Sequence, residues 1–105
     1  MLHSALALVA LVAAINAQRA IHHEAPVRQI ANLGCTEHHA LACARRHGLR
    51  VGYVEVVSAV GAHSPTQALK AWLQSPPHRA IVLDPQLRVA SPYRHGTSWR
   101  VLFAP

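Results

Sequence analysis

A capped helix followed by a proline corner is the feature of this sequence that most constrains its fold. Ser64 is a suitable N-cap, Pro65 takes the first helical position, where its missing N–H is not needed, and Gln67 can reach back toward the cap. Three apolar residues then follow at helical spacing and predict one buried stripe: Leu69, Trp72 and Leu73. The run Ser75-Pro76-Pro77 ends this helix and turns the chain sharply.

A second short helical turn is expected after the corner. Pro77 can begin it, and Asp84-Pro85 ends it. His78 lies directly after the corner, where a side chain can point into a cleft. Taken alone, these residues indicate a core helix that carries a tryptophan, followed by a proline-rich turn.

The sequence around the corner resembles the centre of a bacterial SCP/CAP domain. This superfamily includes the cysteine-rich secretory proteins, antigen five and the plant pathogenesis-related proteins. Residues 71–83 follow the family phrase AWLNSPGHRANIL, with Pro77 in place of its glycine and Ile81 in place of its second asparagine. The resemblance is good over residues 51–104 and weak over residues 15–50, so the family's N-terminal part looks shortened here.

The order of elements predicts the α+β class. Residues 51–60 alternate like a strand, with Tyr53, Glu55 and Val57 on one side. Two further strands are expected after the central helix, at 87–90 and 98–103, with loops at Ser91-Pro92 and His95-Gly96. Residues 22–34 are expected to be mostly loop, with a short helical piece at 27–33. The resemblance implies helices packed on a small antiparallel sheet, as a truncated SCP/CAP-like α-β-α sandwich.

An apolar run from Leu2 to Ala14 opens the chain. It has the length of a signal-peptide core and is too short to span a bilayer. Small residues at Val12, Ala14 and Ala17 offer cleavage sites. We therefore expect residues 1–14 to be a signal peptide, residues 15–105 to be a single domain, and the mature chain to have no transmembrane segment. The start lacks the usual Lys or Arg, which leaves a buried N-terminal helix as the alternative.

The chain is basic, with a formal net charge of +6 and nine histidines besides. This surplus favours acidic partners such as anionic lipid headgroups and cell-wall polymers. Nucleic acid is not expected, because the arginines are scattered apart from Arg45, Arg46 and Arg50, and no aromatic residue lies among these three. Together with the apolar run, the resemblance implies a secreted protein or one of the cell envelope.

Glu55 and His78 are the candidate ligand-binding residues. The sequence Val54-Glu55-Val56 stands where the family's strand reads GENI, so the resemblance implies that Glu55 and His78 share one cleft. A glutamate in an apolar strand needs a partner, and His78 is the expected one. The alternative is that Glu55 points to solvent on an edge strand.

The resemblance further implies an exported binding module whose cleft holds a small lipid-like or cell-wall ligand, or a divalent metal such as zinc at His78 and Glu55. The family's cleft has a second acid and a second histidine. No acid of this sequence matches the former, and His39 and His47 are candidates for the latter by chain order alone.

Common enzyme motifs are missing from the sequence. It contains no Gly-rich phosphate loop and no Gly-x-Ser-x-Gly elbow, and no serine or cysteine stands beside His78 in a nucleophile arrangement. We therefore name no catalytic residue and favour a binding module over an enzyme.

Residues 35–47 carry a rival set of potential metal ligands. Their side chains are of the types that bind zinc: Cys35, His38, His39, Cys43 and His47. A zinc-binding protein or zinc enzyme that uses this segment is the alternative function. If residues 36–47 are one helix, the last three of these ligands share a face.

Two other states of the cysteines stay open. In one continuous helix the two cysteines would stand about 12 Å apart, too far for a disulfide. A disulfide becomes natural in a secreted protein if Cys35 lies in a loop before the helix. Free or buried thiols are the third possibility.

Overall fold

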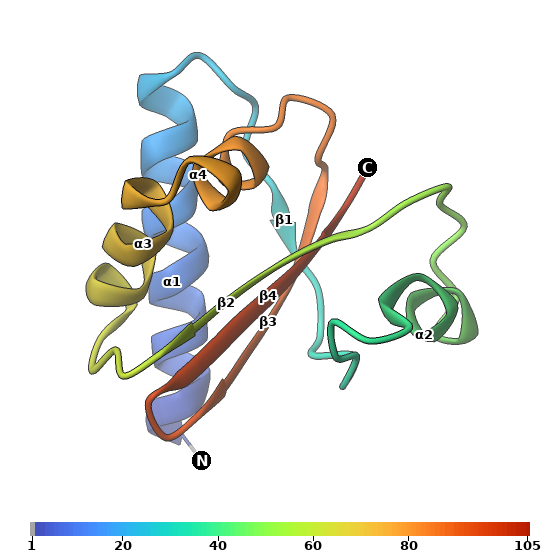
Figure 1. The fold of residues 1–105 in the computed structure, drawn as a ribbon, viewed down its shortest axis with the longest axis horizontal. Coiled ribbons are helices and arrows are strands. Elements are labelled where there is room, and N and C mark those ends of the chain that lie inside the picture. The colour runs from blue at the N-terminus through green and yellow to red at the C-terminus, as the bar shows by residue number, and fades with distance from the viewer. Residues whose placement is uncertain (1) are drawn as a thin grey trace.

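A four-stranded mixed sheet lies between helices on its two faces (Figure 1). The computed structural model describes residues 2–105. The strands, in sheet order, are β1 (Arg28–Gln29), β3 (Val89–His95), β4 (Ser98–Ala104) and β2 (Glu55–Val60). The predicted α+β class is confirmed. The expectation of a purely antiparallel sheet is wrong for β1, which pairs in parallel with β3, whereas the other two pairs are antiparallel.

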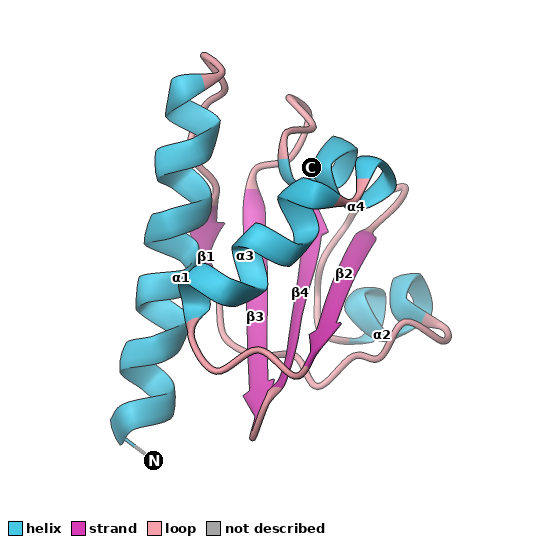
Figure 2. Cartoon of the chain, turned by 60° about the vertical axis from the view of Figure 1, so that its left-hand side comes forward, coloured by secondary structure: helices cyan, strands magenta, loops and turns pink. Residues whose placement is uncertain are grey.

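The helices divide unequally between the two faces. Helices α1 (Leu2–Ile21), α3 (Pro65–Gln74) and α4 (Pro76–Val82) cover one face, and α2 (Ala40–Arg46) lies against the other (Figures 1 and 2). The larger core fills the space under the first three helices, where Trp72 packs with Trp99, Phe103 and Leu87. A smaller cluster lies under α2, where Ala40, Ala44 and Cys35 pack on Leu102.

Helix α3 confirms the sequence interpretation of its start. The Ser64 hydroxyl accepts a hydrogen bond from the Gln67 backbone N–H at 3.2 Å. The Gln67 side chain reaches back one residue further than expected and accepts from the His63 N–H at 2.7 Å. Leu69 and Trp72 are buried, as the apolar stripe requires. The corner falls at Ser75, and α4 begins at Pro76, one residue earlier than expected.

Strand β2 is shorter than the strand expected over residues 51–60, because pairing with β4 begins only at Glu55, opposite Phe103. The predicted alternation of faces is confirmed. Val57 and Tyr53 belong to the core under α1, α3 and α4, whereas Val56 packs on the α2 side.

The helical piece expected at residues 27–33 is wrong. This segment contains β1, where the Arg28 N–H donates to the Arg88 carbonyl at 2.8 Å and the Ile30 N–H to the Ala90 carbonyl at 2.9 Å. Pairing with β3 satisfies these backbone groups and lets Val27 be buried in the core.

The loop expected at Ser91-Pro92 is also wrong, since β3 runs through both residues. Strand β1 ends at the pair of Gln29 with Ala90, so β3 has an unpaired edge from Ser91 onward. A proline is tolerated at such an edge, because no neighbouring strand needs its missing N–H.

The apolar run from Leu2 to Ala14 lies within α1. Met1, the first residue of the expected signal peptide, lies outside the described residues. Leu11 and Val12 are buried in the main core together with Ile15. Cleavage after Ala14 would cut this helix and remove Leu11 and Val12 from the core. The signal-peptide assignment stays a prediction. Across residues 2–105, none of the helices combines the length and the apolar character that a membrane crossing needs.

Candidate functional site

Glu55 lies at the start of β2, the edge strand on which α4 packs. Its side chain is half-buried, and its Oε2 atom is shielded from solvent. Within the described chain, this oxygen accepts no hydrogen bond. A carboxylate oxygen in such a place is costly unless a proton or a ligand supplies the missing donor.

A second acid faces Glu55. Asp84 directly follows the end of α4, and its carboxyl lies close enough to share a hydrogen bond with that of Glu55. Burial is the largest cause that raises the pKa of Glu55, from 4.5 to about 7, and the hydrogen bond and negative charge of Asp84 add to it. Two adjacent carboxyls disfavour simultaneous ionisation, so the pair retains a proton on Glu55 well above the usual range.

Arg19 holds the Asp84 end of the site in place. This arginine is fully buried at the end of α1. Its Nη1 donates to the backbone carbonyls of Val82 and Asp84, both at 2.9 Å, and its Nε donates to the carbonyl of Ala25 at 2.8 Å. The guanidinium thus fixes the end of α4 by two charge-assisted hydrogen bonds, and a third joins it to the loop after α1.

Two polar side chains flank the carboxyl pair. The Tyr53 hydroxyl donates to Gln86 Oε1 at 2.8 Å, and the Gln86 backbone N–H donates to Asp84 Oδ1 at 2.9 Å. The pKa of Tyr53 is raised, first by desolvation and then by the charges of Asp84 and Glu55. Tyr53 and Gln86 therefore add polar groups next to the carboxyls of Glu55 and Asp84.

His78 is half-buried in the first turn of α4, where the sequence placed it. Its Nδ1 lies 2.9 Å from the hydroxyl of Ser75, which leaves Nε2 for another partner. No hydrogen bond or ion pair between His78 and Glu55 is recorded in the described chain. The expected partner of Glu55 is therefore replaced by Asp84, and the assignment of Glu55 and His78 to one ligand site stays a prediction.

Sequence reasoning missed Asp84 and Arg19. Asp84 was interpreted only as part of a helix stop, although the chain has just four acidic residues and this one follows His78 by less than two helical turns. Arg19 belongs to the run Ile15-Asn16-x-x-Arg19, which resembles the family's opening helix, but the sequence assigns it no role, because an arginine at a helix end is usually a solvated side chain.

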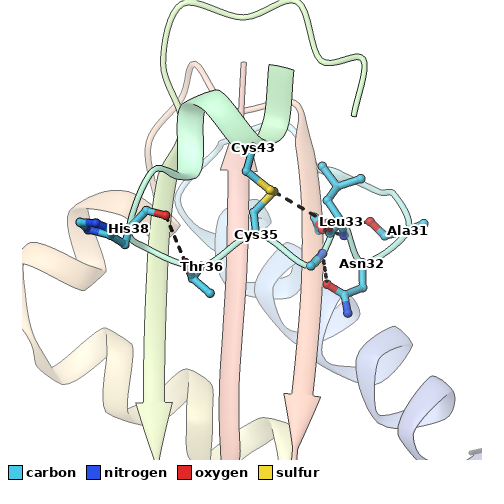
Figure 3. The surroundings of a disulfide bond; sticks show 9 residues. Ala31, Asn32, Leu33, Cys35, Thr36, His38 and Cys43 are labelled. Atoms are coloured by element: carbon cyan, nitrogen blue, oxygen red, sulfur yellow. Dashed lines mark hydrogen bonds between the residues drawn. A yellow bond between two sulfur atoms is a disulfide. The ribbon is translucent and has the colours of Figure 1, made fainter. Parts of the chain in front are cut away.

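The cysteines form a disulfide (Figure 3). Cys35 lies in the loop before α2, and its Cα stands 5.7 Å from that of Cys43. The continuous helix considered over residues 36–47 is wrong, since α2 begins only at Ala40 after His39 takes a left-handed φ of 58°. The bridge ties this loop to α2 on the outer face of the sheet.

His47 joins the two cysteines at the C-cap of α2. Donor atoms of Cys35, Cys43 and His47 lie within 4.8 Å of one another, the one such group of three that residues 2–105 bring together. His38 and His39 are exposed, and their rings lie 4.0 Å apart outside this group. Glu55 and His78 belong to no such group.

Comparison with solved structures gives the class of fold. The chain superposes on a cysteine-rich secretory protein from Staphylococcus aureus with a TM-score of 0.86 and 14% identity over 96% of its residues. It also superposes on an extracellular protein containing an SCP domain from Bacillus anthracis, with a TM-score of 0.84 and 13% identity over 96% of its residues. The chain has the SCP/CAP fold, as the resemblance implied.

The present chain covers 38% and 41% of those two proteins, so it corresponds to less than half of either. No protein-family model matches the sequence. The comparison with curated proteins likewise gives no match.

Proposed function

We propose that the chain is an exported SCP/CAP-like binding module whose ligand contacts Glu55, Asp84 and His78. The observation that carries the proposal is the pair of adjacent carboxyls of Glu55 and Asp84, in which Glu55 Oε2 is shielded from solvent and accepts no hydrogen bond from the rest of the described chain. The fold supports this location for the ligand site, since β2 and α4 are the elements on which the resemblance puts the family's cleft residues.

The ligand is a lipid-like or cell-wall molecule with hydroxyl or amide groups. Such groups can donate to Glu55 Oε2 or to the Tyr53 hydroxyl oxygen, whose own proton goes to Gln86, and can accept from His78 Nε2. A basic surface, with a net charge of +6, would hold the module near anionic envelope polymers. Glu55 and His78 can also hold a divalent metal, which must then compete with the proton on Glu55.

Export is supported by two observations. The two solved structures of the same fold are described as a secretory and an extracellular protein. The disulfide of this chain is stable in an oxidising compartment rather than in a reducing cytosol. We therefore place the protein outside the cytoplasm or in the cell envelope.

The test is a backbone amide NMR titration with two probes: soluble peptidoglycan fragments and vesicles of anionic phospholipid. A probe that binds at the site should shift the amide resonances of Glu55, His78 and Asp84. A Glu55→Gln substitution should weaken the affinity for that probe. Lys70→Gln is the matched control, since Lys70 is exposed on α3. Shifts confined to other surfaces, or equal affinities for both variants, would refute the proposal.

A second candidate function is metal binding by residues 35–47. It is favoured by the cluster of Cys35, Cys43 and His47, which brings soft ligands of the zinc type together. The disulfide occupies both sulfurs in the oxidised chain, so this function depends on the redox state of the bridge.

A further inference from the structure

We infer that Cys35, Cys43 and His47 form a redox-controlled metal site that binds a zinc-like divalent ion when the disulfide is reduced. The inference rests on the second candidate function, is independent of the Glu55 site, and assigns the ligands and the condition for binding. It is carried by the position of His47, whose ring lies beside a disulfide with a donor atom within 4.8 Å of both sulfurs.

The backbone around the two cysteines suits both the disulfide and the metal-bound dithiol. The Cα atoms of the cysteines stand 5.7 Å apart. Two thiolates on one tetrahedral zinc ion, each at about 2.3 Å from the metal, stand about 3.8 Å apart, a separation that side-chain rotation alone can reach from this backbone. The change from bridge to metal site therefore needs no refolding of α2.

The three residues lie between the small cluster under α2 and solvent, since Cys35 is buried and His47 is exposed. The sulfur of Cys35 lies 3.9 Å from the carbonyl oxygen of Leu33 (Figure 3). A metal ion would therefore reach this group from the side of His47.

The reaction balances in two steps. A dithiol reductant transfers two electrons and two protons to the Cys35–Cys43 bond, which breaks to give two thiols, while the reductant closes its own disulfide. A divalent ion then displaces the two thiol protons and binds both sulfurs and the neutral imidazole of His47. Oxidation by a disulfide of higher potential reverses the sequence and releases the ion.

The test is a zinc competition assay with a chromogenic chelator on three chains: the parent, His47→Gln and His38→Gln. Each is measured oxidised and after reduction by a phosphine. His38 is the matched control, because it is an exposed histidine in the loop that carries Cys35 and lies outside the three-residue group.

The reduced parent should bind one equivalent of zinc, and the oxidised parent none. His47→Gln should weaken zinc binding at least about tenfold, the lower limit for loss of a supporting residue, and His38→Gln should not. Cobalt(II) in place of zinc should give a sulfur-to-metal charge-transfer band in the reduced parent. If reduction loosens the fold, added zinc should restore the far-UV circular dichroism of the parent, because metal binding is then coupled to folding.

Three results would overturn the inference. Equal zinc affinity of the oxidised and reduced parent would remove the redox control. Equal weakening by the two histidine substitutions would remove the specific role of His47, while leaving metal binding by residues 35–47 standing. No binding by the reduced parent would remove both this inference and the second candidate function, and would leave the Glu55 proposal untouched.

Discussion

The carboxyl of Glu55 makes stability depend on pH in a definite direction. Its pKa is raised to about 7 in the folded chain from an ordinary value of 4.5, so its protonated form favours folding. The contribution is fully present below about pH 4.5 and is lost as pH rises through about 7, because the ionised side chain is the disfavoured form in the folded state.

We therefore predict that Glu55→Gln stabilises the protein above pH 7 and flattens the stability profile between pH 4.5 and 7. Urea unfolding at a series of pH values measures this, since an uncharged amide of similar shape cannot titrate. Glu24→Gln, which changes an acid elsewhere in the chain, is the control. A Glu55→Gln profile parallel to that of the parent would contradict the raised pKa.

Arg19 should be among the least replaceable side chains. It is fully buried and donates to the carbonyls of Ala25, Val82 and Asp84. Arg19→Met should cost about 3 kcal/mol or more of unfolding free energy, since it leaves several buried acceptors unpaired. Arg19→Lys should recover only part of this, because an ammonium cannot reproduce the planar fork. Denaturant unfolding of both variants is the measurement, and a loss below about 1 kcal/mol for Arg19→Met would argue against the role.

At the scale of elements, α3 provides the central packing unit. Trp72 is 1% exposed and packs in the main core. Trp72→Ala should cost about 3–5 kcal/mol, as expected for a large buried aromatic. Thermal unfolding gives the result, with Lys70→Ala on the exposed side of the same helix as control. A melting temperature close to that of the parent would mean that α3 is not packed through Trp72.

The elements with local signals were predictable from the sequence. The start of α3, its stop at Ser75 and the alternation of β2 follow from capping, proline and side-chain period, which act within a few residues. Strand β1 was not predictable, because its two residues form a strand only by pairing with β3, more than fifty positions away along the chain. Pro92 was misinterpreted for the same reason, since its tolerance depends on where β1 ends.

The sequence points to only part of the candidate site. Glu55 and His78 are expected from the resemblance, position by position, and their membership of one site stays a prediction. Asp84 faces Glu55 because Arg19 holds the end of α4, a relation between α1 and α4 that leaves no periodic trace in the sequence. The disulfide depended on whether Cys35 lies inside or outside α2, and helix boundaries are the least certain part of any sequence interpretation.

At the scale of the whole molecule, cleavage near the N-terminus would determine how much of α1 remains in the mature protein. If residues 1–14 are a signal peptide, protein recovered outside the cytoplasm should begin near Ile15 or Gln18. Mass spectrometry of the exported and cell-retained protein measures the first residue. Exported protein that still carries Leu11 and Val12 would show instead that the run is kept as the core of α1, where both are buried.

The hydrogen bonds from Arg19 to the end of α4 also have an evolutionary consequence. One guanidinium in the first helix holds the backbone of Asp84, and the side chain of Asp84 faces Glu55 on the edge strand. A lineage that loses this arginine loses the support for the backbone at position 84, and with it the placement of the acid, even if Asp84 and Glu55 are both kept. The pairing of the two acids is therefore tied to a residue whose hydrogen bonds all go to backbone carbonyls.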